Sequence, residues 1–356
     1  MKTLFIGSIV EYSGKNLLSL GVGKHYIEKN LNVGYFKPLG ISPVEKGDDV
    51  VDADAMFFQN EMALKDKLSD ICPVMLTSEY VNDIYSGTKV NVEGKIQSAY
   101  KRVSENKDLM IVSGFGNISC GCLIDASQVD TMRKFDCKVI IIDRYAYNER
   151  EMVDGFIWMK ETLGDKLLGV VFNKIPQSKK EFFTSKVVPF LRKKGIDTVG
   201  ILPDDPVLHS LPVRDIVEFL HGRLVCCEEQ IDNLCERICV GAMNVTSALK
   251  YFKNIHNKVV ITGGDRGDIQ LAALETSTRC LILTGDLQPH NNIIMTAMAK
   301  KVPIVVVPYD TLTTVDKFEM VLGHLSLRGD KKVEAAVNVV SECIDFGMID
   351  KYVMGK

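Results

Sequence analysis

Residues 7–16, GSIVEYSGKN, carry the residue types that bind a phosphate group. They join the apolar run KTLFI to a helical pattern, and a loop that enters a helix directs its backbone N–H groups toward an anion. Gly14 lets the backbone approach a ligand closely, and Lys15 supplies a positive charge for the terminal phosphates. The stretch predicts a phosphate-binding loop that contacts a nucleotide through Ser13, Gly14, Lys15 and Asn16.

This loop departs from the usual pattern G-x-x-x-x-G-K-[ST] at two places. Ile9 stands where the leading glycine belongs, and Asn16 stands where a serine or threonine hydroxyl would hold Mg²⁺. Taken alone, the stretch also fits an ordinary turn between a strand and a helix, with Lys15 in solvent. Its position directly after the first strand favours the phosphate-binding interpretation.

Further along the chain, strand ends with small and hydroxyl residues suit a second ligand pocket. The stretch VVITGGDRGDIQLAAL ends an apolar strand in two glycines, which leave room for a ligand or a neighbouring backbone. Similar strand ends occur in LILTGDLQPHN and VPYDTLTT. The alternative is that Asp265 and Arg266 form a structural ion pair that fixes the turn. The candidate pocket residues are Thr262, Gly263, Gly264, Asp265, Arg266, Thr284, Gly285 and Thr311.

The elements that would position the first site alternate between apolar strands and amphipathic helices. Several strand candidates are apolar throughout, as expected of strands buried on both faces of a parallel sheet. The alternation predicts an α/β domain with a doubly wound, mostly parallel sheet. The strand candidates are residues 2–7, 32–40, 108–114, 138–145, 167–175 and 197–203, and the helical patterns are residues 17–30, 92–106 and 151–164.

The pattern changes after Pro203, where PDDPVLHSLPVRDIVEFLHG contains three prolines before a helix begins. A second, shorter series of strand and helix patterns follows, as in KVVITGGDRGDIQLAALET. We therefore expect a phosphate-loop domain at residues 1–208 and a smaller α/β domain at residues 209–330. Residues 331–356 have apolar side chains at helical spacing, which predicts a C-terminal helix that packs back on a core.

The composition is that of an ordinary globular protein. Of the 356 residues, 46% are hydrophobic and 25% are charged, with a formal net charge of −3. This balance gives no electrostatic footprint for nucleic acid or an anionic membrane, and no run approaches the ~18 apolar residues of a membrane span. The first apolar run is too short for a signal peptide. The sequence predicts a cytoplasmic protein with no nucleic-acid or membrane partner.

Ten cysteines raise the question of a metal site. One candidate group is SCGC at residues 119–122. The other is Cys227, Cys235 and Cys239 on a helical pattern, where Cys235 and Cys239 would share one face. Neither group has the paired C-x-x-C spacing of zinc or iron–sulfur sites. We therefore expect free thiols, as is usual in a reducing compartment.

The first domain resembles the dethiobiotin synthetase family and, more closely, the dethiobiotin-synthetase-like N-terminal domain of long phosphate acetyltransferases. The resemblance covers roughly residues 1–210 and rests on the order of several short motifs. YFKPLG resembles the Lys-Pro motif of the synthetases, which implies that Lys37 lies beside a substrate. GVVFNKI and GILPDD resemble the strand ends that meet the adenine, which implies base-binding roles for Asn173 and Pro203.

The same resemblance places a metal ligand at Asp54. DADAMFFQ resembles the Asp-Ala segment whose Asp helps to hold Mg²⁺, and LMIVSGFG falls where the family carries a Glu-Gly pair. Here Ser113 replaces that acid and Asn16 replaces the loop hydroxyl, so Asp54 is the one ligand that remains. Mg²⁺ prefers carboxylate, hydroxyl and phosphate oxygens and neutralises the charge of phosphoryl transfer. We expect binding of ATP or ADP with weak Mg²⁺ binding, and very slow hydrolysis or none.

The glycine-rich strand end of the second domain resembles the DRTGG domain over about residues 215–325. That domain occurs in the middle of long phosphate acetyltransferases and is regarded as a ligand-sensing or dimerising module. The combination implies the N-terminal part of such an acetyltransferase without its catalytic domain. The leading hypothesis is a nucleotide-binding regulatory protein, expected to be a homodimer, that controls a metabolic enzyme on a separate chain.

Two alternatives remain open. An ATP-dependent ligase of the dethiobiotin synthetase type would act on a carboxylate or carbamate, with Lys15 and Lys37 as the candidate catalytic residues beside the reacting phosphate. In the second alternative, both domains form a dimerisation scaffold, and the phosphate loop is vestigial.

Overall fold

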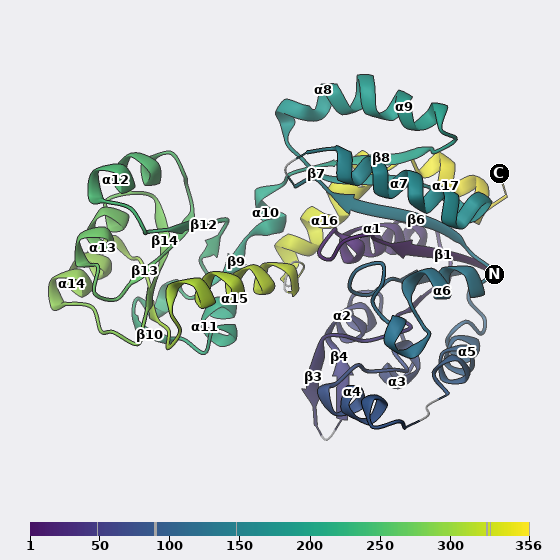
Figure 1. Ribbon diagram of the computed structural model, residues 1–356, viewed down its shortest axis with the longest axis horizontal. Helices are drawn as coiled ribbons and strands as arrows, with labels where there is room; N and C mark the ends of the chain where they lie inside the picture. Colours follow the sequence, from purple (N-terminus) through teal and green to yellow (C-terminus); the bar gives the residue numbers. More distant parts are fainter. Residues whose placement is uncertain (48, 89–90, 147, 325–326, 328, 356) are drawn as a thin grey trace. The chain divides into compact units, whose positions relative to one another are not determined.

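The structure is a computed structural model that describes residues 1–47, 49–88, 91–146, 148–324, 327 and 329–355 (Figure 1). The chain forms two compact units. The first contains Met1–Asp204 and Val333–Lys356, and the second contains Asp205–Lys332. Lys356, the last residue of the predicted C-terminal helix, lies outside the described residues.

The first unit is built on a six-stranded sheet in the order β2-β5-β1-β6-β7-β8, and every neighbouring pair is parallel. The predicted doubly wound, mostly parallel α/β fold is confirmed. The strands are β1 (Lys2–Gly7), β2 (Val33–Phe36), β5 (Leu109–Ser113), β6 (Lys138–Arg144), β7 (Leu167–Ile175) and β8 (Thr198–Pro203), and a separate antiparallel hairpin joins β3 (Pro43–Lys46) to β4 (Asp49–Asp52).

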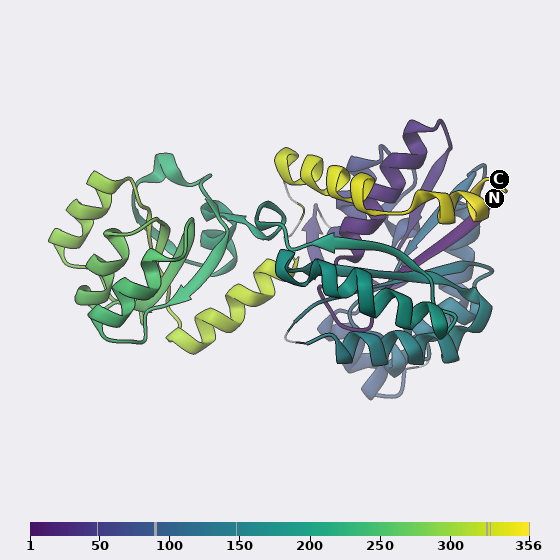
Figure 2. The same ribbon diagram turned by 90° about the horizontal axis from the view of Figure 1, so that it is seen from above.

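Helices cover both faces of this sheet. Figure 2 shows α1, α16 and α17 on one face and α7, α8 and α9 on the other. A π-helical turn, η4 (Phe183–Val187), joins α8 to α9. The helices of this part of the chain are α1 (Lys15–Glu28), α2 (Ala53–Glu61), α3 (Leu68–Ile71), α4 (Ser78–Tyr85), α5 (Val92–Val103), α6 (Gln128–Lys134), α7 (Arg150–Leu163), α8 (Lys180–Phe182), α9 (Val188–Lys193), α16 (Asp330–Cys343) and α17 (Phe346–Val353), with short 3₁₀ helices at Cys122–Ile124, Gly164–Lys166 and Gln177–Lys179.

The central strands are apolar throughout because both of their faces are covered. In β1, Leu4, Phe5 and Ile6 are all fully buried. Phe5 belongs to one continuous core cluster that also contains Ile96 of α5 and Phe156 of α7. Strands and helices of this kind place the loop after β1 at the carboxyl edge of the sheet, where α/β proteins bind ligands.

The C-terminal residues form two helices, α16 and α17, where the sequence predicted one. The break falls at Ile344, which bridges to Gly200 of β8. Both helices contact the first unit closely. Val340 of α16 lies so near Gly21 of α1 that an added Cβ there would stand 2.4 Å from the Val340 side chain. Tyr352 of α17 donates a hydrogen bond from its hydroxyl to the Thr3 carbonyl at 2.8 Å.

The second unit has a five-stranded sheet in the order β10-β15-β14-β13-β12, in which β10 is antiparallel to β15 and the other pairs are parallel. The strands are β10 (Arg223–Cys226), β12 (Arg237–Val240), β13 (Lys258–Gly263), β14 (Thr278–Thr284) and β15 (Ile304–Val306), with a short ribbon of β9 (Leu211–Pro212) and β11 (Leu234–Cys235). The helices are α10 (Pro206–His209), α11 (Val213–Phe219), α12 (Val245–Lys253), α13 (Gly267–Leu274), α14 (Asn291–Lys300) and α15 (Thr311–His324), and a 3₁₀ turn lies at Glu228–Gln230.

The predicted helix bearing Cys227, Cys235 and Cys239 is wrong. Cys235 lies on β11 and Cys239 on β12, and both are buried in cores of the second unit. Cys227 precedes a 3₁₀ turn with a positive φ of 61°. The physical reason is strand pairing, because β12 pairs with β13 along its whole length, and such long-range pairing overrides a local helical spacing. All ten cysteines are free thiols.

Within the described ranges, no helix has both the length and the apolar character that a membrane crossing requires.

Candidate functional site

The phosphate-loop candidate connects β1 to α1 as the sequence predicts. Gly14 is the residue before the helix and has a φ of +102°, a left-handed conformation that favours glycine. A Cβ at this position would lie 2.3 Å from Nδ2 of Asn173. That Nδ2 donates a hydrogen bond of 2.8 Å to the Ser13 carbonyl, so the tip of β7 fixes the loop. Glycine is therefore required at position 14 both for backbone shape and for space.

Lys15 bends back over the loop and does not extend into solvent. Its Nζ donates hydrogen bonds of 2.8 Å to Oγ of Ser8 and 2.8 Å to the carbonyl of Gly116. Burial, and next the positive charge of Lys37, lower the pKa of Lys15 from 10.5 to about 8. The lowered pKa means that the protein stabilises the charged form of Lys15 poorly. An anion bound beside the loop would stabilise this ammonium.

Asp143 is a loop-supporting residue that the sequence analysis missed. Its Oδ1 accepts a hydrogen bond of 2.7 Å from Oγ of Ser13, whose hydroxyl also lies 2.9 Å from the Val10 carbonyl. Burial raises the pKa of the Asp143 carboxyl, although hydrogen bonds from Ser13 and the Arg144 amide oppose that shift. The available signal was an acid at the carboxyl end of an apolar strand, in KVIIIDR.

Lys37 lies in a buried cluster with two carboxylates. Its Nζ donates to both oxygens of Asp52, at 2.8 and 3.0 Å, and to Oδ2 of Asp54. The Lys37 side chain is 1% exposed and that of Asp54 is 22% exposed. Burial opposes the charged form of Lys37, but Asp54 and Asp52 together raise its pKa well above the ordinary value. All three donors of Lys37 are thus directed at protein carboxylates, and Asp52 is a second residue that the sequence analysis did not single out.

Asn16 completes this cluster from the first turn of α1. Its Nδ2 donates a hydrogen bond of 2.7 Å to Oδ1 of Asp54. Although burial opposes ionisation, the charge of Lys37 and the hydrogen bonds from Lys37 and Asn16 lower the pKa of the Asp54 carboxyl. Asp54 is therefore ionised, with one oxygen on an ammonium and the other on an amide.

This donor set does not fit Mg²⁺. The ion prefers about six oxygen ligands, whereas Asn16 turns its amide nitrogen toward Asp54 and Lys37 adds a positive charge to the same carboxylate. Ser113 is fully buried, and its Oγ donates to the Gly114 carbonyl at 3.3 Å. No group of three or more His, Cys, Asp or Glu side chains in the described ranges is placed to hold a metal ion.

Asn173 and Pro203, the predicted base-binding residues, lie at the carboxyl ends of β7 and β8. Asn173 contacts the loop directly, as described, and its Oδ1 accepts from the Lys174 amide at 2.8 Å. Pro203 pairs with Ile175, two residues beyond Asn173. The structure therefore brings Ser13, Gly14 and Asn173 together, and Pro203 lies on the neighbouring strand of the same sheet edge.

Gln128 is a third residue that the sequence analysis missed. It is fully buried at the start of α6 and holds the segment that follows β5. Its Nε2 donates to the carbonyls of Phe115 at 2.8 Å and Asn117 at 2.6 Å. This segment includes Gly116, whose carbonyl accepts from Lys15. A glutamine at the start of a short helix gave no sequence signal for this role.

In the second unit, several of the predicted pocket residues meet at the carboxyl ends of β13 and β14. Oγ1 of Thr284 lies 2.9 Å from Oγ1 of Thr311, and the Gly264 amide donates to the Thr284 carbonyl at 3.1 Å. Oγ1 of Thr262 donates to the Gly241 carbonyl at 3.2 Å. Gly285 has a φ of +84°. Gly263 ends β13, and its carbonyl accepts from Gln270 at 3.0 Å.

The alternative ion pair between Asp265 and Arg266 is wrong. Arg266 pairs with Asp268, with Nε 3.0 Å from Oδ1, and also donates to the Met243 carbonyl at 3.2 Å. The reason is local geometry, because Arg266 is the residue before α13 and Asp268 stands in its first turn. Both charged side chains are largely exposed, so the pair contributes little to stability.

Two family models match the chain. One, described as an AAA domain, matches residues 2–211, and the other, the DRTGG domain, matches residues 215–321. The chain belongs to the AAA domain family. Its AAA domain contains the loop and the Lys37 cluster, and its DRTGG domain contains the strand ends of the second unit.

Curated relatives confirm the resemblance predicted from the motifs. The phosphate acetyltransferase of Synechocystis sp. is 22% identical over 361 residues, which cover 96% of this chain and 50% of the relative. The ATP-dependent dethiobiotin synthetase of Methanococcus vannielii is 25% identical over 199 residues, which cover 54% of this chain and 88% of the relative. The chain thus spans about half the length of the acetyltransferases that it matches, whereas the match to the synthetase covers about half of this chain.

The solved structures that match this chain do so with low TM-scores. The regulatory CBS and DRTGG region of Clostridium perfringens pyrophosphatase, complexed with diadenosine tetraphosphate, is 18% identical, with a TM-score of 0.28 over 43% of this chain and 71% of that one. The hydrogenase maturation factor HypB of Archaeoglobus fulgidus is 16% identical, with a TM-score of 0.33 over 57% of this chain and 81% of that one. Both scores are too low to support a conclusion about this chain.

Proposed function

We propose that the AAA domain binds the phosphates of ATP or ADP without a divalent cation, and that the protein is a nucleotide-binding regulator. The single observation that supports this most strongly is the commitment of both Asp54 oxygens to Asn16 and Lys37. A carboxylate held by an amide and an ammonium is a poor metal ligand, whereas the loop N–H groups and Lys15 need no metal to attract phosphate.

Phosphoryl transfer depends strongly on the metal, because Mg²⁺ neutralises the charge on the transferred group and its leaving oxygen. Loss of such a clamp costs several kcal/mol of transition-state stabilisation, and each ~1.4 kcal/mol is a factor of ten in rate. Binding loses much less, since the ground-state phosphates contact the loop and Lys15 directly. The expected behaviour is nucleotide binding with negligible turnover.

We infer a regulatory role because the chain joins this nucleotide site to a DRTGG domain, a module regarded as ligand-sensing. The partner would be a metabolic enzyme on another chain or on a longer form of this one. Calorimetric titration of the purified chain with ATP and with ADP tests the binding step, and release of inorganic phosphate tests turnover. Saturable binding with no phosphate release above a protein-free control supports the proposal, and absence of binding to either nucleotide contradicts it.

A second candidate function is an ATP-dependent ligase of the dethiobiotin synthetase type, acting on a carboxylate or carbamate. The observation that favours it is the joint presence of Lys15, Lys37 and Asp54, with Lys37 in direct contact with Asp54. In that case a bound substrate would have to displace the Asn16 amide from Asp54 and admit Mg²⁺. Phosphate release that requires Mg²⁺ together with a candidate acid or amine would favour this function, and the Asp54→Asn variant would abolish it.

A further inference from the structure

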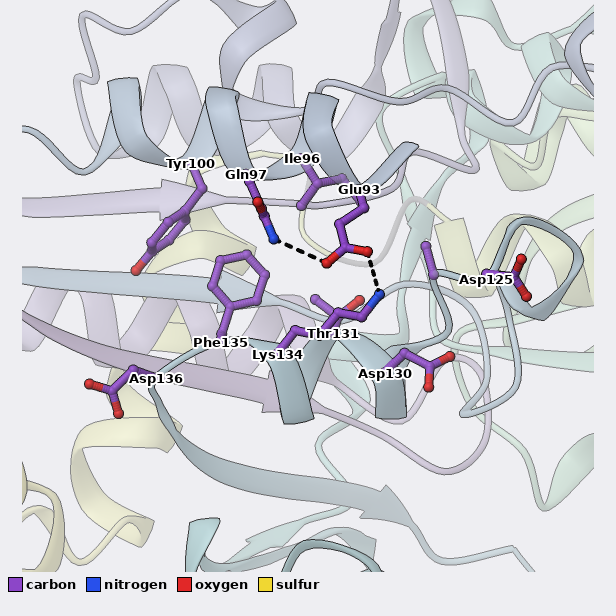
Figure 3. Close-up of a pocket in the computed structure, with 11 residues that line it drawn as sticks. Glu93, Ile96, Gln97, Tyr100, Asp125, Asp130, Thr131, Lys134, Phe135 and Asp136 are labelled. Carbon is purple, nitrogen blue, oxygen red and sulfur yellow. Dashed lines mark hydrogen bonds and ion pairs between the residues drawn. The ribbon is translucent and has the colours of Figure 1, made fainter. Parts of the chain in front are cut away.

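A groove lies between α5 and α6 in the first unit, outside the nucleotide site. It has a volume of about 250 Å³. Figure 3 shows Ile96, Tyr100 and Phe135 among its lining side chains, with charged residues around them. Ile96 is 6% exposed and belongs to the main core of the unit. The floor of the groove is therefore rigid and apolar.

The rim of this groove is acidic. Glu93, Asp125, Asp130 and Asp136 line it together with one cation, Lys134. Lys134 is already paired with Glu93 at 2.9 Å, and no other lysine or arginine lines the groove. Asp130 accepts hydrogen bonds from Ser127 at the start of α6 but keeps its negative charge, so Asp125, Asp130 and Asp136 make the opening acidic. An occupant with apolar or aromatic side chains and positive charges would match both the floor and the rim.

The segment from α8 to α9 presents such side chains. Phe182, Lys186, Phe190 and Lys194 follow one another at four-residue intervals, so they form a stripe along one side of the helix. Phe182 is 41% exposed and Phe190 is 45% exposed, which is unusual for phenylalanine. Nζ of Lys194 lies 6.0 Å from the centroid of the Phe190 ring. The stripe thus alternates exposed aromatic rings with exposed cations.

The buried side chains of this segment also recur every four residues. Phe183, Val187 and Leu191 are all buried, each one residue after a member of the stripe. The π-helical turn at Phe183–Val187 lies in the middle of this series. Because each member of the stripe precedes a buried residue by one position, the stripe runs next to the buried face of the helix. Phe182 and Phe190 therefore lie at the surface on the same side.

The segment is strongly basic although the whole chain has a net charge of −3. Between residues 177 and 194 it contains one acid, Glu181, and six exposed cations, namely Lys179, Lys180, Lys186, Arg192, Lys193 and Lys194. In the part of the chain that the structure describes, none of these six forms an ion pair. Their charges are therefore available to an acidic partner surface.

We propose that the occupant of the groove is the stripe of a second copy of this chain. The groove offers an apolar floor with an acidic rim, and the stripe offers aromatic rings with cations. Both surfaces belong to the same helical layer, since α5, α6, α7 and the α8–α9 segment contribute to one core cluster. Two copies related by a two-fold axis would each insert a stripe into the groove of the other, forming two equivalent contacts.

Trp158 gives this arrangement an independent marker. It is the only tryptophan of the chain and is 46% exposed on α7. In Figure 1, α7 lies between α6 and the α8–α9 segment, so a dimer that joins the groove to the stripe would cover it. Trp158 would then lie near the two-fold axis.

Light scattering over a dilution series tests the dimer, with charge reversal on each surface. Lys186→Glu with Lys194→Glu reverses the stripe, and Glu93→Lys with Asp136→Lys reverses the groove rim. Each pair of changes should weaken the dimer at least ~10-fold, because like charges would then face each other. A chain that carries all four changes should recover the dimer, since the charges are again complementary. Lys250→Glu with Lys253→Glu on α12 is the matched control and should change nothing.

The outcomes are distinct. A chain that is monomeric at about 100 µM, a dimer that survives either reversal, or a four-fold variant that stays monomeric although circular dichroism shows it folded would each overturn the proposal. Trp158 emission should shift to shorter wavelength and become less accessible to acrylamide as the dimer forms. A dimer in which Trp158 stays as accessible as in the monomer would overturn it too. Binding of the monomer to anionic phosphatidylserine vesicles, lost in the stripe variant, would assign the stripe to a lipid surface instead.

Discussion

The side-chain amide of Asn16 donates a hydrogen bond of 2.7 Å to Oδ1 of Asp54. This bond links the first turn of α1 to the first turn of α2. It also turns the one acid that would hold Mg²⁺ into a structural acceptor, because its other oxygen already bonds Lys37. The loop beside it remains shaped for phosphate. Anion binding and metal binding are thus separated at this site.

Nucleotide affinity should depend on pH through Lys15. Its pKa in the free protein is about 8, below the ordinary 10.5. A bound phosphate stabilises the ammonium and raises that pKa, so binding above pH 8 must include uptake of a proton. Affinity should be flat between pH 7 and 7.5 and should fall by up to ~10-fold per pH unit above 8.

Calorimetry in two buffers of different ionisation enthalpy measures this proton uptake directly. The Lys15→Ala variant should bind ATP more weakly and lose the pH dependence above 8. Lys24→Ala, on the same helix but outside the loop, serves as the control. An unchanged pH profile in Lys15→Ala would show that another group titrates.

Gly14→Ala should damage both stability and binding. The left-handed φ of +102° costs about 1–2 kcal/mol for alanine, and the new Cβ would force Asn173 away from the Ser13 carbonyl. Gly47→Ala is a matched control, because Gly47 has a φ of +64° with nothing within 4 Å. Urea unfolding should show a larger loss for Gly14→Ala, and only that variant should lose ATP binding. Equal losses in the two variants would argue against the contact with Asn173.

Lys37→Met should be among the most destabilising single changes in the chain. It leaves Asp52 and Asp54 close together without their shared cation, and breaking a buried pair in this way costs about 3–5 kcal/mol. Lys29→Met removes an exposed partner of Asp350 and should cost less than about 1 kcal/mol. The comparison is made by chemical denaturation at pH 7. A similar small cost for both variants would mean that Lys37 is not the charged centre of the cluster.

Asn16→Thr should restore a dependence on Mg²⁺. The substitution removes the amide donor from Oδ1 of Asp54 and supplies a hydroxyl, which is a better ligand for a hard cation. The ATP dissociation constant measured in EDTA should then exceed that in Mg²⁺ by several-fold. Asn16→Ala, which removes the amide without adding a hydroxyl, is the control. No gain of Mg²⁺ dependence in the threonine variant would mean that the Asn16–Asp54 bond is not what excludes the ion.

The sequence predicts the parts of this site that depend on neighbours along the chain. The loop after β1 follows from an apolar run, a glycine and a lysine in direct succession, and the sheet follows from runs of Val and Ile such as KVIIIDR. Contacts between residues that are far apart in the chain leave no comparable pattern in the sequence. Lys37 and Asp52 meet because the β3–β4 hairpin folds back, and Gln128 reaches the loop after β5 from the start of another helix.

The errors have the same origin. The four-residue spacing of Cys235 and Cys239 fits a helix equally well, and only pairing with β9 and β13 makes these residues parts of two strands. The partner of Arg266 is Asp268 because the start of α13 places that acid within 3.0 Å of Nε, a geometry that adjacency in sequence does not reveal. Local pattern predicts the elements whose periodicity is unambiguous, whereas tertiary pairing decides the ambiguous segments and determines which side chains meet.

The most direct test compares calorimetric titrations of the wild-type chain with ATP in excess Mg²⁺ and in excess EDTA, at the same pH and ionic strength. The account predicts saturable binding in both, with dissociation constants that agree within about three-fold, since the loop and Lys15 supply the attraction. Binding that appears only with Mg²⁺ would contradict it, because Asp54 would then have to leave Asn16 to hold the ion.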